Sequence, residues 1–408
     1  MKTTGWGFGW LATCVLLTAP CVLGADGDWP QWRGPRQDGI SLETGLLASW
    51  PEDGPPELWR TPLGAGYSAV SVVDGRAYTM YGTETEELVV CIDVTDGSTV
   101  WKTHSAESFE NEYGNGPRAT PTIDDGRVYT HGATGSLLCL DANTGDKIWG
   151  FNTLERFGAK PLEFGMSASP VVIGDMLVIV VGAEDGKSLV ALNKASGEVL
   201  WASLSDLGGY STPIHIEVDG TKQIVVLTGK FVVGVAADDG HELWRHPWET
   251  TLDANVATPI YHDGRLFIST GYGTGCALFE LSANNGVAEA KELWDSKSMK
   301  NYFSTSVLHN GHLYGFNNTM LTCMEFETGD VTWRARGFNK GSVLLADGKL
   351  IILGERGTLA LAETSLEEYK EISRVEAFDG KTWTVPTVAG GKLFLRNEEE
   401  LVCLNLKP

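Results

Sequence analysis

The sequence has few basic residues and, beyond its first residues, no long apolar run. Its 31 lysine and arginine side chains are outnumbered by 53 aspartates and glutamates, which leaves a net charge of −22. Such a charge repels phosphate groups, and it therefore argues against binding to nucleic acid or to an anionic lipid surface. No later run approaches the roughly 20 apolar residues that a transmembrane helix needs. We therefore expect neither a nucleic-acid partner nor a membrane span.

Several motifs of catalytic and metal sites are also missing. The eight histidines, among them His131 and His215, are scattered without the H-x-x-x-H spacing of zinc sites, and no C-x-x-C pair is present. No G-x-S-x-G elbow is present, and the glycine-rich run from Gly271 to Gly275 has Cys276 where a dinucleotide fingerprint requires its third glycine. We therefore predict no metal ligands and no catalytic residues of these classes.

The first 24 residues have the pattern of a secretory signal. Lys2 precedes an apolar run, and the small residues Val22 and Gly24 suit cleavage before Ala25. Residues 17–21 also outline a lipoprotein box, although the proline directly before Cys21 fits that motif badly. We predict a signal peptide over residues 1–24 and a secreted or periplasmic protein.

Five of the seven cysteines remain after such a cleavage, and four of them occupy one position of a repeated L-x-C pattern: Cys91, Cys139, Cys323 and Cys403. The corresponding residue of another copy is Ala191. A small residue that fills a tight gap explains this exchange. Equivalent positions of separate repeats should lie too far apart for disulfide bonds, so we predict none.

A strand–turn–strand unit recurs along the chain, and its clearest copy, residues 137–149, reads L-L-C-L-D-A-N-T-G-D-K-I-W. In front of it, residues 119–130 spell a strand that begins at a proline, a D-G turn and an aromatic strand. One repeat therefore predicts four antiparallel strands. Because such self-similarity is typical of closed repeat folds, the repeat predicts a β-propeller.

The aromatic residue that ends each repeat predicts the number of blades. These closing residues are expected to dock each blade against the next, and they are Trp59, Trp101, Trp149, Trp201, Trp244, Trp294 and Trp333, with Tyr369 as the expected eighth aromatic residue. After Tyr369 the chain spells three more strands and stops, whereas residues 57–60 are an isolated closing strand. We therefore predict an all-β, eight-bladed propeller over residues 57–408, whose last blade is completed by the N-terminal strand. Residues 25–56 should form an irregular lead-in, with Trp29 and Trp32 capping the fold from outside.

The repeat, [TS]-P-x-[VI]-x-D-G-x-[VL]-Y followed by G-x-L-x-[AC]-L-D-x-x-T-G-x-x-x-W, resembles the pyrroloquinoline-quinone (PQQ) type repeat. That repeat builds the quinoprotein alcohol dehydrogenases and the outer-membrane assembly lipoprotein BamB. The resemblance covers residues 57–408, and the lead-in W-P-Q-W-R-G-P is similar to that of secreted PQQ-binding-like β-propeller repeat proteins. The resemblance implies the fold, whereas function depends on the individual site.

A quinoprotein dehydrogenase, as the resemblance defines it, needs calcium, a catalytic aspartate, an aromatic stacking partner and usually a ring formed by adjacent cysteines. The chain has no Cys-Cys pair. Its recurrent acidic residues, such as Asp93 and Asp141, fall at turn positions, where an aspartate caps its own turn. The sequence contains no calcium-binding loop rich in oxygen ligands. We therefore predict no cofactor and no metal.

The residues before the innermost strand of each blade should crowd one mouth of the central channel. Most are small and hydroxylated, which packing explains. The exceptions are our ligand-binding candidates: Tyr67, Arg118, Tyr210, Asn255, Asn301, Tyr302, Lys340 and Trp383. Two cations among them suggest an anionic or carbonyl-bearing ligand. The competing interpretation is that they pair with local carboxylates and fill the channel.

These patterns favour a non-catalytic, monomeric binding or scaffolding propeller. Its partner would be another extracytoplasmic protein or a small anionic or carbonyl ligand. The alternative is a PQQ- and calcium-dependent oxidoreductase of alcohols or sugars, with an unusual pocket around Arg118, Lys340 and Trp383.

Overall fold

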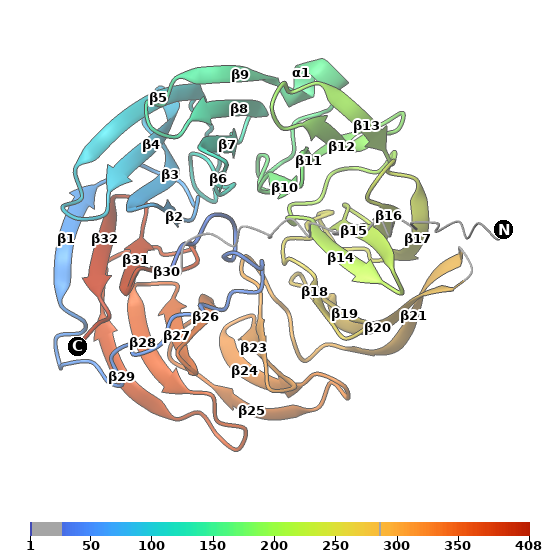
Figure 1. The fold of residues 1–408 in the computed structure, drawn as a ribbon. Helices are drawn as coiled ribbons and strands as arrows, with labels where there is room; N and C mark the ends of the chain where they lie inside the picture. The colour runs from blue at the N-terminus through green and yellow to red at the C-terminus, as the bar shows by residue number, and fades with distance from the viewer. Residues whose placement is uncertain (2–26, 285–286) are drawn as a thin grey trace.

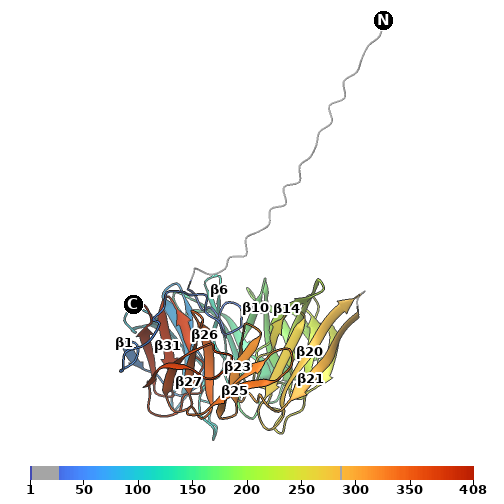
Figure 2. The same cartoon turned by 90° about the horizontal axis from the view of Figure 1, so that it is seen from below.

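The computed structural model describes residue 1 and residues 27–284 and 287–408. Its 32 strands form eight antiparallel sheets of four strands each, which are arranged as blades around a ring (Figure 1). From the side the ring is a disc (Figure 2). The predicted eight-bladed propeller is therefore confirmed. The predicted signal peptide, with its lipoprotein alternative, lies outside the described residues except for Met1.

The first four blades follow one another along the chain, each with its strands in order from the channel to the rim. Blade 1 contains β2 (Ser71–Val73), β3 (Arg76–Gly82), β4 (Glu86–Asp93) and β5 (Thr99–Glu107); blade 2 contains β6 (Thr122–Asp124), β7 (Arg127–His131), β8 (Ser136–Asp141) and β9 (Lys147–Asn152); blade 3 contains β10 (Val171–Ile173), β11 (Met176–Ala183), β12 (Lys187–Asn193) and β13 (Val199–Ser203); blade 4 contains β14 (Ile214–Val218), β15 (Thr221–Leu227), β16 (Phe231–Ala236) and β17 (Glu242–Pro247).

The other four blades complete the ring, and the last of them takes its outer strand from the N-terminal side, as predicted. Blade 5 contains β18 (Ile260–His262), β19 (Arg265–Thr270), β20 (Gly275–Asn284) and β21 (Val287–Ser296); blade 6 contains β22 (Val307–His309), β23 (His312–Asn317), β24 (Met320–Glu325) and β25 (Val331–Ala335); blade 7 contains β26 (Gly341–Ala346), β27 (Lys349–Gly354), β28 (Thr358–Glu363) and β29 (Glu371–Glu376); blade 8 contains β30 (Thr387–Ala389), β31 (Lys392–Arg396), β32 (Glu400–Asn405) and β1 (Glu57–Pro62).

Two-residue turns join the innermost strand to the second strand in all eight blades. Six of these turns are Asp-Gly or Asn-Gly. Their first residues have φ between 45° and 50°, and the glycines that follow also have positive φ. This conformation is the type I′ hairpin geometry, which aspartate or asparagine followed by glycine adopts most readily. Helix is almost absent: within the described ranges the structure has one short helix, α1 (Thr153–Phe157), and no helix long and apolar enough to cross a membrane.

Each closing tryptophan lies opposite a small or apolar residue of its own blade and reaches the neighbouring blade. Trp101 is paired in register with Cys91, and its indole N–H donates to the carbonyl oxygen of Ala142 in blade 2 at 3.0 Å. A Cβ on Gly145 of that blade would lie only 2.6 Å from the indole, so the turn requires glycine there. The four cysteines of the repeat position and Cys276 are buried and free.

Not every junction between blades has this hydrogen bond. The indole N–H groups of Trp59, Trp149, Trp294 and Trp333 donate to carbonyl oxygens of the next blade. Trp244 instead donates to Gln223 of its own blade at 2.8 Å, and the buried indole nitrogen of Trp201 has no partner within the described chain. Within the described chain, the hydrogen bond from tryptophan to the next blade is therefore missing between blades 3 and 4 and between blades 4 and 5.

The prediction that Tyr369 is the eighth closing aromatic residue is wrong. Strand β29 begins after it, and the register pairs Leu361 with Ser373, so Ser373 holds the position that tryptophan holds in the other blades. Trp50 of the lead-in lies beside this serine. The Ser373 hydroxyl accepts a hydrogen bond from the Trp50 backbone N–H at 2.8 Å, and Trp50 is buried in a core cluster that includes Leu361 of blade 7 and Leu404 of blade 8. Tyr369 packs against Trp333, with ring centroids 5.9 Å apart.

The prediction that Trp29 and Trp32 cap the fold from outside is wrong. Trp29 is buried and pairs with Val72 of blade 1. The Trp32 indole N–H donates to the hydroxyl of Thr258 at 2.8 Å, and Thr258 precedes the innermost strand of blade 5 in the chain. The segment therefore crosses the centre of the ring (Figure 1).

Arg33 fixes this crossing. Its buried guanidinium donates to the carbonyl oxygens of Thr305 and Ser306 in front of blade 6 at 3.2 and 2.8 Å, and to that of Asp38 at 2.7 Å. Burial lowers the pKa of Arg33 to about 10, so the group remains a cation at neutral pH. A buried charge is tolerated because carbonyl oxygens surround it. The lead-in is therefore packed into the propeller.

Replacement of Trp50 by alanine tests the role of the lead-in. Loss of a buried tryptophan leaves a cavity, so Trp50→Ala should lower the free energy of unfolding by about 3–5 kcal/mol in urea denaturation. Leu58→Ala, an exposed residue on β1, is the control and should change it by less than about 0.5 kcal/mol. Equal stability of the Trp50 variant and the control would contradict the assignment.

Candidate functional site

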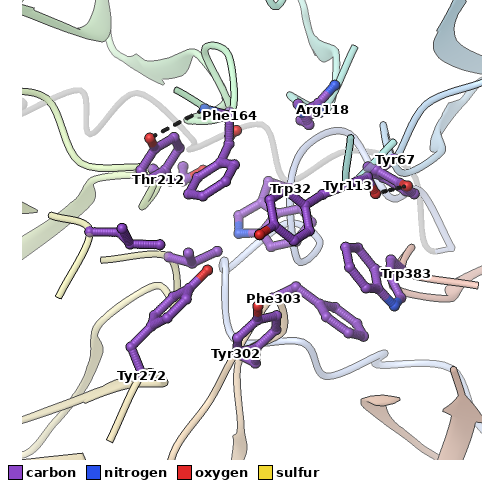
Figure 3. A pocket seen from close by; sticks show the side chains of 14 residues that line it. Trp32, Tyr67, Tyr113, Arg118, Phe164, Thr212, Tyr272, Tyr302, Phe303 and Trp383 are labelled. Carbon is purple, nitrogen blue, oxygen red and sulfur yellow. Dashed lines mark hydrogen bonds between the residues drawn. The ribbon is translucent and has the colours of Figure 1, made fainter. Parts of the chain in front are cut away.

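A cavity of about 160 Å³ opens at one mouth of the channel (Figure 3). Its walls come from the segments that precede the innermost strands of all blades except the seventh, together with the β19–β20 turn and the lead-in. Nine of its fourteen lining residues are aromatic, which makes it a largely apolar site: Trp32, Tyr67, Tyr113, Phe164, Tyr210, Tyr272, Tyr302, Phe303 and Trp383, with Arg118, Ser167, Thr212, Leu252 and Val256.

Five of the eight sequence candidates meet in this lining: Tyr67, Arg118, Tyr210, Tyr302 and Trp383. Lys340 lies beside it, with its ammonium nitrogen 3.9 Å from the centroid of the Tyr302 ring. The non-repeating residues in front of the innermost strands therefore do come together at one mouth.

Asn255 and Asn301 do not line the cavity. Both are buried in the walls. The Asn255 amide nitrogen donates to the carbonyl oxygens of Thr228 and Trp248 at 2.8 and 3.1 Å, and its oxygen accepts from the Thr270 hydroxyl at 2.9 Å. Asn301 similarly donates to the carbonyl oxygen of Phe316. Their polar atoms hold the connecting segments, so the structure gives them a positioning role.

Five aromatic residues of the lining were missed in the sequence: Trp32, Tyr113, Phe164, Tyr272 and Phe303. Trp32 lies in the middle of the group in Figure 3. Phe303 directly follows a candidate, so the same alignment could have found it. Tyr113 and Phe164 belong to irregular segments that do not repeat, and Tyr272 occupies a turn with φ of 51°. No periodic signal marks these three.

The aromatic side chains pack on one another. Phe303 and Trp383 are stacked, with ring centroids 5.1 Å apart and planes 22° apart. Tyr67 approaches Trp383 at 5.5 Å, and Tyr272 approaches Tyr302 at 4.9 Å. Contacts of this kind stabilise ring pairs beyond their buried area. The walls of the cavity are therefore preformed.

Arg118 is held by the backbone and by aromatic rings. Its guanidinium donates to the carbonyl oxygens of Gly114, at 2.7 Å, and Gly116, and it lies 4.6 Å from the centroid of the Phe109 ring. Burial lowers its pKa to about 10, so it remains a cation at neutral pH. It thus donates to carbonyl oxygens, whereas the competing interpretation had it paired with a carboxylate.

Lys381 is a third cation at this mouth, and it was not among the candidates. Its ammonium nitrogen donates to the Tyr113 carbonyl oxygen at 2.8 Å and to the Tyr67 hydroxyl at 3.0 Å, and it lies 3.8 Å from Glu398. The Trp383 indole N–H donates a hydrogen bond to a carboxylate oxygen of Glu355 at 2.9 Å. Glu398 and Glu355 are therefore engaged by protein groups.

Glu87 is a buried carboxyl group between blades 1 and 2. One of its oxygens accepts from the Ala133 backbone N–H at 3.1 Å, and the other has no partner within the described chain. Burial raises the pKa of Glu87 to about 7, although the Ala133 hydrogen bond and the charge of Arg118 lower it. The folded protein therefore retains a proton here at a pH where the unfolded chain has lost it.

The site fits a calcium-bound quinone poorly. Such a group needs carboxylate or amide oxygens for the metal and a carboxylate as base, and none of the fourteen lining residues supplies either. Within the described ranges, the one cluster of three metal-ligand side chains is Asp238, Asp239 and His241. All three are exposed at the β16–β17 turn, away from the cavity.

Comparisons with known proteins place this geometry in context. The family model for the outer membrane protein assembly factor BamB matches residues 45–156 and 85–335. The quinoprotein alcohol dehydrogenase PedH of Pseudomonas putida is 27% identical over 176 residues, which are 39% of this chain and 27% of the enzyme. BamB of Shewanella oneidensis is 24% identical over 294 residues, 64% of this chain and 72% of that protein.

The matches span only 24% to 29% of the lengths of the quinoprotein dehydrogenases. Solved structures show the same fold. BamB from Moraxella catarrhalis has a TM-score of 0.61 at 14% identity, covering 85% of this chain and all of that one. The quinohemoprotein alcohol dehydrogenase from Comamonas testosteroni has a TM-score of 0.63 at 12% identity, covering 94% of this chain and 81% of that one. The resemblance seen in the repeats is thereby confirmed.

Glu87→Gln tests the buried carboxyl group. Because its pKa is raised from 4.5 to about 7 on folding, its contribution to stability is greatest below pH 4.5 and declines as the pH rises to about 7. Glutamine does not titrate, so the free energy of unfolding of the variant lacks this decline. Relative to that of wild type, it should rise between pH 4.5 and about 7 by on the order of 2–3 kcal/mol. Urea denaturation at several pH values measures this difference. Glu184→Gln, at an exposed site, controls for loss of one negative charge. A pH-independent difference for Glu87→Gln would contradict the assignment.

Proposed function

This chain belongs to the family of the outer membrane protein assembly factor BamB, and from that premise we propose that it is a non-catalytic binding propeller. Its recognition surface is the aromatic cavity and the loops around it. We place its work outside the cytoplasm, because its first 24 residues have a signal pattern and its family is named for outer membrane assembly.

The observation that carries this proposal is the composition of the cavity. Most of its lining is aromatic or aliphatic, and no carboxylate belongs to it. Small-molecule sites are typically preformed, apolar and concave, with a few polar groups that orient the ligand. A site of this kind binds a ligand, and none of its lining side chains is a carboxylate or a histidine that would take a proton from a substrate.

The size of the cavity limits what it accepts. An engineered apolar cavity of about 150 Å³ holds a molecule as large as benzene, and this one has a volume of about 160 Å³. It suits a small molecule with one ring, or one side chain of a partner protein. A partner protein outside the cytoplasm is supported by the relatives named for outer membrane assembly.

The alternative is a quinone-dependent oxidoreductase of alcohols or sugars. It is favoured by the relatives that are quinoprotein dehydrogenases and by the gathering of Arg118, Lys340 and Trp383 at one mouth. The lack of carboxylate and amide oxygens among the lining side chains counts against it. We therefore keep the binding function as the conclusion.

Addition of PQQ and calcium to the purified protein separates the two functions. We expect no bound-cofactor absorption band and no reduction of an artificial dye with alcohols or sugars, because no lining side chain offers a carboxylate or amide oxygen to the metal. A quinoprotein dehydrogenase treated in parallel is the positive control. Alcohol-dependent dye reduction by this protein would overturn the binding function.

Occupation of the cavity by a neutral ring tests the binding site itself. Indole should raise the melting temperature of the wild-type protein, because a ligand at 100 times its Kd stabilises the native state by about 2.7 kcal/mol. Val256→Trp places a large side chain in the lining and should abolish this rise. Val199→Trp, at an exposed position on β13, should leave it unchanged. An equal rise in both variants would show that indole binds elsewhere.

A further inference from the structure

Three cations of this acidic protein lie over aromatic rings at the cavity mouth. The charged groups of Lys340, Lys381 and Arg118 lie 3.9, 4.7 and 4.6 Å from the ring centroids of Tyr302, Trp383 and Phe109. A cation over a ring is attracted by the negative face of its quadrupole. The protein's own cations therefore already use several of the ring faces at this site.

One pair of the lining rings is stacked, and the others meet at larger angles. Trp383 stacks on Phe303, and Tyr272 approaches Tyr302. Rings that meet at such angles also present their edges to a guest, and ring edges carry the positive part of the quadrupole. A cationic ligand, the usual guest of an aromatic cage, would meet positive edges and three fixed positive charges. The electrostatics of the cavity therefore disfavour cations and favour an anion.

The three cations differ in how they are neutralised. Arg118 donates to two carbonyl oxygens, and Lys381 contacts a tyrosine hydroxyl, a carbonyl oxygen and a carboxylate. The half-buried ammonium of Lys340 has ring contacts but no hydrogen-bond acceptor or ion-pair partner in the part of the chain that the structure describes. Lys340 is thus the group with most to gain from an incoming anion, because charge-assisted hydrogen bonds are the stronger ones.

We propose that the cavity takes a small, mainly apolar ligand with a single anionic group, of the chemical class of an aryl carboxylate. The apolar ring would lie among the aromatic side chains near Trp32, and the anion would bind Lys340. This inference rests on the proposed binding function and adds the charge of the ligand. One anionic group suffices, because one cation at the mouth lacks a counter-group.

Calorimetric titration of the full-length protein with three matched probes tests the charge preference. The probes are benzoate, its neutral isostere benzamide, and the cation phenyltrimethylammonium. We expect benzoate to bind at least tenfold more tightly than benzamide, and the cation to bind more weakly than both. Higher salt should weaken the binding of benzoate more than that of benzamide, because an ionic interaction is screened.

Lys340→Met removes the charge and keeps an apolar stem of similar length. It should weaken benzoate binding at least fivefold and leave benzamide binding unchanged. Lys147→Met makes the same change of charge at an exposed residue of β9 in blade 2 and should change neither. Circular dichroism and the melting temperature of both variants establish that they are folded.

Each outcome decides the inference. Equal affinity for benzoate and benzamide, stronger binding of the cation, or unchanged benzoate affinity in Lys340→Met would overturn it. If indole and benzamide bind while benzoate shows no preference, the binding function stands and only the charge preference fails. If no probe binds and Val256→Trp does not alter the response to indole, the cavity is not the recognition site and both proposals fail.

Discussion

The contact between an indole and the glycine of the neighbouring blade is the interaction on which the ring depends. A Cβ on Gly97, Gly145 or Gly197 would lie 2.6 to 2.9 Å from the tryptophan of the preceding blade. All three glycines have positive φ. The same residue thus closes its own turn and leaves room for the indole. Repetition of this contact fixes the angle between blades, and the ring in turn holds the segments before the innermost strands at one mouth.

The lead-in completes the ring where the repeat fails. Ser373 stands where the other blades have tryptophan, and Trp50 is buried beside it in a core cluster shared with blades 7 and 8. Earlier in the same segment, Arg33 binds carbonyl oxygens in front of blade 6, and Trp32 becomes part of the cavity. One irregular segment therefore contributes both to the closure of the propeller and to the site.

The sequence predicted what repetition encodes. Blade number, strand order, the hairpin turns and the donation of β1 to the last blade all follow from comparing copies, because each copy solves the same packing problem. The site departs from repetition, and only part of it was predictable. Tyr67, Arg118 and Trp383 were found because they stand at aligned positions, whereas Tyr113 and Phe164 come from segments without an aligned counterpart. Asn255 also stands out in the alignment, yet its hydrogen bonds are all internal.

The chemistry of the cavity follows from how its charges are placed. Aromatic rings supply an apolar interior, protein cations lie over several rings, and Glu355 and Glu398 are already engaged by protein groups. A crystal structure of the full chain grown with 4-iodobenzoate tests this account most directly, because anomalous scattering locates the iodine without ambiguity. The account predicts an iodine peak inside the cavity near Trp32, with the carboxylate at Lys340. A peak confined to other surfaces, or an empty cavity at saturating ligand, would contradict it.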